Sequence, residues 1–114
     1  MNKYVILVEG CCPSRLDVVE LASRDGIAAI YEAELVIKNQ LKYDKNTDAF
    51  DARICQKTGI VTTSENGTKS QMYDAVMCSH NGMDWHLNDN DHDESNMLIE
   101  VSKDCNGKLW VSAI

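Results

Sequence analysis

The side chains best suited to metal binding or acid–base chemistry are concentrated in one segment of this sequence. All three histidines, His80, His86 and His92, lie between residues 70 and 102, where there is no lysine or arginine. Seven of the chain's 18 carboxylates share that stretch, and the other 11 are balanced by 11 lysines and arginines. The formal net charge of −7 therefore belongs to this acidic segment, which contains Asp74, Asp84, Asp89, Asp91, Asp93, Glu94 and Glu100.

The spacing of the central acids resembles the calcium loop of EF-hand proteins. Asp89, Asp91 and Asp93 alternate, and Glu100 stands at the twelfth position of the loop. Calcium takes six to eight oxygen ligands, which alternate acids on a tight loop can supply. The sixth position is Glu94 where the motif needs glycine, and the flanking sequence reads as strand, so this is not an EF-hand. Two interpretations remain: a looser calcium site formed by Asp89, Asp91, Asp93 and Glu100, or an ordinary solvated acidic loop between two strands.

A thiol and two imidazoles form a second candidate metal site. Cys78 and His80 stand two residues apart, and His86 follows six residues later. Imidazole and thiolate are both good zinc ligands. His80 and His86 flank the turn signal Asn81-Gly82 and can face each other across a hairpin if both leave the sheet on one side. The alternative is ordinary surface or hydrogen-bonded histidines, because the spacing matches no common zinc motif.

Trp85, in the same acidic segment, points to a different function. Aromatic residues surrounded by polar ones are typical of interface hot spots, and the alternative is a core tryptophan whose indole N–H finds a hydrogen-bond partner. Close acids repel one another by about 1 kcal/mol per pair in water, so a cation, a basic partner or a base supplied by the fold must relieve them. Our leading hypothesis is a small acidic interaction or inhibitor-type protein, comparable with immunity proteins, that binds a basic protein surface. Its binding residues would be Asp84, Trp85, His86, Asp89, Asp91, Asp93 and Glu94.

The alternative function is a domain that binds a small molecule or a divalent metal ion in this same segment. Catalysis is left open, and a non-enzymatic role is favoured. Cys11 and Cys12 follow an expected strand and precede an expected helix, where a thiolate would be stabilised. The competing interpretation is that both are structural thiols.

Composition excludes several partners and suggests a compartment. A net negative chain without a run of lysine or arginine repels phosphate backbones and anionic lipids, so we expect neither direct nucleic-acid binding nor membrane binding. The longest early apolar run, Tyr4–Val8, is too short for a signal peptide or a membrane span. Five cysteines, an odd number without a C-x-x-C motif, indicate free thiols in a reducing cytoplasm.

The run Tyr4–Gly10, which ends in Glu9-Gly10, resembles the first strand of Toprim domains, where a glutamate before a glycine works in phosphoryl transfer. That family also needs a strand that ends in a D-x-D pair. Here Asp89 and Asp91 follow no apolar strand, and the intervening α/β alternation is missing. The resemblance therefore implies no activity for this chain.

The elements that must position these side chains follow from the apolar periodicity. Residues 3–9 form a strand that is apolar on both faces, so we expect it in the middle of a sheet. Helical spacing predicts helices over 14–24 and 27–43, and the apolar, buried face of the second includes Ile27, Ile30, Ile37 and Leu41. Alternation and three Asn-Gly pairs then predict an antiparallel meander, with strands near 50–55, 69–79, 97–104 and 108–114. The predicted fold is one α+β domain, residues 1–114, with both helices on one face of the sheet.

The last expected strand, residues 108–114, also suggests self-association. It alternates in hydrophobicity and carries no charge beyond Lys108. An unprotected sheet edge can pair with a copy of itself, which would give a homodimer.

Overall fold

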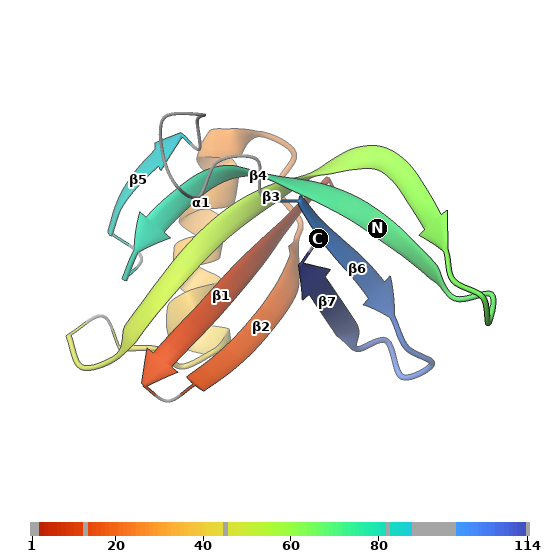
Figure 1. The fold of residues 1–114 in the computed structure, drawn as a ribbon. Helices are drawn as coiled ribbons and strands as arrows, with labels where there is room; N and C mark the ends of the chain where they lie inside the picture. Colours follow the sequence, from red (N-terminus) through yellow and green to blue (C-terminus); the bar gives the residue numbers. More distant parts are fainter. Residues whose placement is uncertain (1–2, 13, 45, 82, 88–97, 114) are drawn as a thin grey trace.

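The protein is an antiparallel sheet with one helix against it. A computed structural model describes residues 3–12, 14–44, 46–81, 83–87 and 98–113. The helix α1 spans Gly26–Leu35 and continues into a π-helical turn, η1, at Val36–Gln40. The strands are β1 (Tyr4–Cys12), β2 (Ser14–Leu21), β3 (Ala49–Thr63), β4 (Lys69–His80), β5 (Met83–Leu87), β6 (Leu98–Lys103) and β7 (Leu109–Ala113) (Figure 1).

The strands form one curled sheet in the order β2-β1-β3-β4-β6-β7, with β5 beside the other end of β4. Every described pair is antiparallel. The sheet curls until β7 comes into contact with β2, so that the sheet is nearly closed into a barrel (Figure 1). An ion pair of 3.0 Å between Lys103 of β6 and Glu20 of β2 spans the remaining gap.

The central strand β1 is buried on both sides, and this divides the core into two parts. Its even-numbered side chains, Tyr4, Ile6 and Val8, face α1 and pack with Leu21, Ala29, Ala33 and Ile37. Its odd-numbered side chains, Val5 and Leu7, face the concave side, where the curl of the sheet covers them with Cys55, Tyr73, Ile99 and Val101. The prediction that this strand is apolar on both faces and lies within the sheet is confirmed.

The predicted fold class is wrong: the structure is mostly strand, with one helix instead of two. In place of the helix predicted over residues 14–24, Ser14–Leu21 forms β2, which pairs with β1 from Cys11↔Ser14 to Tyr4↔Leu21. Val18 and Val19 leave the strand on opposite sides, and both pack against a core. The physical reason is that a central strand needs hydrogen-bonding partners at both edges, and this need outweighed the helical spacing.

The second predicted helix, residues 27–43, is confirmed in its position, but it is shorter than predicted and buries a different face. Asp25 caps its start, because its carboxylate accepts from the Ala28 amide at 2.9 Å. The small residues Ala29 and Ala33, with Ile37, form the buried face, while Ile27, predicted to be buried, is 71% exposed. Among the described residues, no helix is long and apolar enough to cross a membrane.

β4 pairs with β5 on either side of Asn81, and hairpins form at Asn66-Gly67 and Asn106-Gly107 with a turn other than the type I′ that Asn-Gly pairs favour. At 64–68 and 104–108, only the glycine has positive φ, at 86° for Gly67 and 82° for Gly107. Each glycine amide bonds back to the residue three positions earlier, as in a type I turn that ends in a glycine bulge. The hydroxyl of Ser64 and the carboxylate of Asp104 accept amide hydrogens within these turns.

Candidate functional site

The concave face of the sheet becomes polar near the β4–β5 hairpin. The strand registers place Glu9 opposite Asp51, Asp51 opposite His80, and Cys78 opposite both Arg53 and His86. These positions continue the alternation that puts Cys55 into the concave core farther along β3. We call this group the polar cluster: Glu9, Asp51, Arg53, Cys78, His80 and His86.

The closest pair in the polar cluster is a thiol and an imidazole. Cys78 Sγ lies 3.0 Å from His86 Nε2, and His86 Nδ1 lies 3.3 Å from the carbonyl oxygen of Asp84. A carbonyl only accepts, so Nδ1 carries the ring proton and Nε2 presents its lone pair to the thiol. Enzymes with a catalytic thiol combine a nucleophile, a base and a third group that orients the base. Cys78 is only 5% exposed, however, so this thiol is largely covered.

His80 lies on the same side of the sheet as that pair. Its Nδ1 is 2.7 Å from Asp51 Oδ1, and its ring centroid is 6.5 Å from that of His86. The two histidines that flank the Asn81 turn therefore face the same side, as the zinc hypothesis requires. In their present conformations, the described residues include no group of three or more His, Cys, Asp or Glu side chains placed to hold a metal ion.

The remaining members of the polar cluster are an ion pair. Arg53 Nη1 donates to Glu9 Oε1 at 2.7 Å, and the arginine side chain is only 12% exposed. Glu9, the residue that resembles the Toprim glutamate, thus forms an ion pair with the Arg53 side chain. Glu9, Asp51 and Arg53 were not predicted from the sequence as members of this site. Period-two alternation places Asp51 and Arg53 on one face, but their partners come from strands distant in sequence.

The predicted partner-binding residues in β5 point to opposite sides. Asp84 is exposed and has a φ of 55°, and His86 faces the polar cluster. Trp85 instead packs against the core below α1, where its indole nitrogen is buried without a hydrogen-bond partner among the described residues. The other predicted binding residues, Asp89, Asp91, Asp93 and Glu94, lie outside the residues that the structure describes.

Glu100, predicted as the last calcium ligand, lies in β6. Its carboxylate accepts a hydrogen bond of 2.6 Å from the Thr62 hydroxyl. It pairs with Met72, six residues along β4 from Cys78, which is roughly 20 Å at 3.3 Å per residue. Glu100 is therefore not part of the polar cluster.

Cys11 was predicted to precede a helix, and the structure corrects this premise. It lies at the end of β1 opposite Ser14 of β2, so no helix dipole acts on its exposed thiol. The side chain of Cys12 lies outside those that the structure describes.

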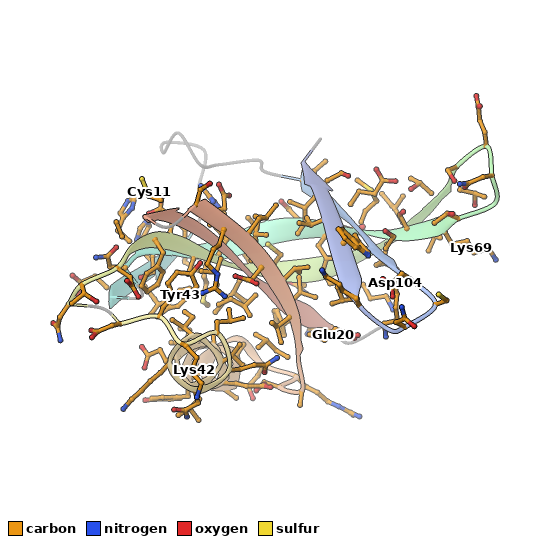
Figure 2. The ribbon with its side chains drawn as sticks, turned by 90° about the horizontal axis from the view of Figure 1, so that it is seen from below. Cys11, Glu20, Lys42, Tyr43, Lys69 and Asp104 are labelled. Atoms are coloured by element: carbon orange, nitrogen blue, oxygen red, sulfur yellow. The ribbon has the colours of Figure 1, made fainter. Side chains whose placement is uncertain are left out.

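Two other features of the surface bear on binding. A hollow of about 480 Å³ lies at the C-terminal end of the helix, lined by Ile37, Lys38, Tyr43, Asp44 and Asn46; Figure 2 shows Tyr43 between helix and sheet. On the outer face of α1, Ile27, Tyr31 and Leu35 are 71%, 67% and 59% exposed. Because they follow one another at four-residue spacing, they form a continuous apolar strip, which we call the α1 strip.

No protein-family model matches the chain, and neither a curated protein nor a solved structure matches it.

Proposed function

We propose that this protein works by binding a protein partner that has a basic surface, through residues 84–94 of the acidic segment. The observation that carries the proposal is the balance of charge around Asp84 and His86. The fold brings two more carboxylates, Glu9 and Asp51, to this side of the sheet. The one guanidinium that it brings there, Arg53, is already paired with Glu9.

This balance favours a basic partner for a physical reason. In the sequence, the acids of residues 84–94 have no neighbouring base, and relief had to come from the fold or from a bound cation or protein. Among the described members of the polar cluster, the fold adds more negative charge than positive. Such a surface attracts a complementary basic patch, accelerates encounter and sets orientation. Specifically, we propose that the protein acts in the cytoplasm as an inhibitor-type protein.

The proposal is tested by affinity capture from a cytoplasmic extract with the full chain as bait. We expect a basic protein to be captured, with the yield falling as salt is raised, because screening weakens exposed charge pairs. The variant Asp84→Asn/Asp91→Asn removes two charges from the segment and should reduce capture several-fold. A matched control, Glu34→Gln/Glu65→Gln, removes two charges elsewhere and should leave capture unchanged.

Two results would overturn the proposal. One is equal capture by the wild type and the Asp84/Asp91 variant at every salt concentration. The other is loss of capture in Tyr31→Ser with no loss in the Asp84/Asp91 variant, because the partner would then use the α1 strip.

The second candidate function is binding of a small molecule or a divalent metal ion, with catalysis left open. The Cys78–His86 pair and the hollow beside Tyr43 support it. Thermal melting with calcium, zinc and EDTA tests the metal part. An ion at 100 times its Kd adds about 2.7 kcal/mol to the unfolding free energy, and no shift for any ion would exclude metal binding.

Self-association through residues 108–114 remains a further proposal about partners. The edge of β7 faces β2 in the curled sheet, which restricts the room for a second copy. Light scattering over a range of protein concentrations tests it, and a monomer mass at the highest concentration would refute a homodimer.

A further inference from the structure

We infer that Cys78, His86 and His80 form a closable binding site for a zinc-type divalent metal ion on the concave face. The inference is independent of the proposed partner. Its first support is the β4–β5 register, which places Cys78 directly opposite His86. Sγ and Nε2 are already 3.0 Å apart. A tetrahedral zinc ion bound to both atoms would hold them about 3.5 Å apart, so a movement of about half an ångström admits it.

The second support is the way that both histidines are oriented by oxygen atoms. His80 Nδ1 faces the Asp51 carboxylate at 2.7 Å, and His86 Nδ1 faces the Asp84 carbonyl at 3.3 Å. Both contacts keep the ring proton on Nδ1 and leave Nε2 as the donor atom. Zinc-binding histidines are typically held by a carboxylate or a backbone carbonyl in this manner, which fixes the tautomer and the ring orientation.

The third support is that the side chain that must still move to complete the site, His80, is exposed. The ring centroids of His80 and His86 are 6.5 Å apart, whereas two imidazoles on one zinc ion lie roughly 5–6 Å apart. The His80 side chain is 71% exposed, so a small rotation can bring its Nε2 to the metal without disturbing the core. Water would occupy the fourth position.

Local charge favours a cation here. The Asp51 carboxylate contacts His80, Glu9 lies opposite Asp51 in the strand register, and Arg53 is paired with Glu9. Metal binding deprotonates the Cys78 thiol, and the proton goes to solvent buffer; no oxidant or reductant is needed. The bound ion would join β4 to β5 within the acidic segment.

The test is a titration of the full chain, purified without metal, with Co²⁺ as a spectroscopic probe for zinc. We expect one Co²⁺ per chain, with a thiolate-to-cobalt charge-transfer band that Zn²⁺ removes by displacement. Cys78→Ser should abolish the band, and His86→Gln and His80→Gln should each weaken affinity at least tenfold. Asp51→Asn should weaken it about 10- to 100-fold, because Asp51 positions His80 without touching the metal.

Matched controls keep the test decisive. Cys11→Ser and Cys105→Ser remove the exposed thiols and should leave the band unchanged. Each variant is first checked for a cooperative melt without metal, and a variant that has lost its fold is replaced by Cys78→Ala or His86→Asn. Absence of saturable binding would overturn the inference. So would a band that survives Cys78→Ser, a band lost with Cys11 or Cys105, or unchanged affinity in His80→Gln. Partner capture is measured in EDTA, so the two proposals fail separately.

Discussion

Lys103 Nζ in β6 lies 3.0 Å from Glu20 Oε1 in β2, and this ion pair connects the two ends of the curled sheet. The Glu20 side chain is 21% exposed and that of Lys103 is 46% exposed, so the pair is partly shielded from water. β7, the neighbour of β6, also contacts β2, although these two strands stand at opposite ends of the strand order and are not paired.

We expect Lys103→Met to lower the unfolding free energy by about 1 kcal/mol, because it removes one cationic partner of a partly buried carboxylate. Urea unfolding at low and high salt measures the effect, and the loss should shrink at 1 M salt, where exposed pairs are screened. Lys69→Met is the control. Figure 2 shows Lys69 at the far end of the β3–β4 hairpin, and its replacement should cost little. Equal losses in the two variants would contradict a specific role for the ion pair.

The concave core should make the protein sensitive to alkali. Burial raises the pKa of Cys55 from 9.0 to about 12, against a lowering effect of Arg53. Burial, with smaller contributions from Glu20 and Cys55, raises the pKa of Tyr73 from 10.0 to about 12. Below pH 9 both groups are protonated in both states. Above pH 9 the unfolded chain releases these protons first, so stability falls up to about pH 12.

The expected loss is several kcal/mol, since each pKa unit is worth about 1.4 kcal/mol. Denaturant unfolding between pH 8 and 11 measures it. Cys55→Ala should delay the decline by removing the group that ionises first in the unfolded chain, and Tyr73→Phe should reduce the slope above pH 10. A pH profile unchanged in both variants would show that other groups control alkaline unfolding.

Glu32 holds the connection between β2 and α1, and it should contribute to stability above acidic pH. Its carboxylate accepts from the Ala22 amide, the Ser23 amide and the Ser23 hydroxyl, at 2.8, 2.8 and 2.6 Å. Burial alone would raise the pKa of Glu32, but these hydrogen bonds outweigh it and lower the pKa below 4.5. The stabilisation is therefore present above pH 4.5 and is lost as pH falls through the folded-state pKa.

Glu32→Ala should lower the unfolding free energy at pH 7 by about 1 kcal/mol, and less at pH 3. The control is Glu34→Ala on the same helix, for which no such contacts are recorded. An equal effect of Glu32→Ala at both pH values would exclude the ionised carboxylate as the cause.

Two isoleucines of the helical segment differ in burial, so their replacement by alanine should differ in its cost to stability. Ile37 is 1% exposed and packs below the sheet, whereas Ile27 is 71% exposed. Ile37→Ala should cost about 2–5 kcal/mol, and Ile27→Ala should stay within about 0.5 kcal/mol. The predicted helix had both residues on its buried side, and equal costs in chemical unfolding would favour that earlier interpretation over the structure.

Local patterns in the sequence were sufficient to locate most strands and all three hairpin turns. Alternation predicted the strands that became β4, β6 and β7, because a period of two reports directly on which side chains are buried. Asn-Gly pairs predicted the turns, although the turn type at Gly67 and Gly107 depended on capping by Ser64 and Asp104. The charge of the acidic segment was likewise evident from composition alone.

Only the tertiary structure decided that Ser14–Leu21 is a strand and which side chains form the polar cluster. The stretch fits a helical or an extended pattern locally, and its pairing with β1 decided between them. Asp51 and His80 are 29 residues apart, and Glu9 and Arg53 are 44 apart. Such contacts depend on strand order and register, which are set by burial of both faces of β1 and by curling of the sheet. Neither strand order nor register is encoded in local spacing. The sequence therefore indicated which residue types could form a site, but not which residues lie next to one another in the fold.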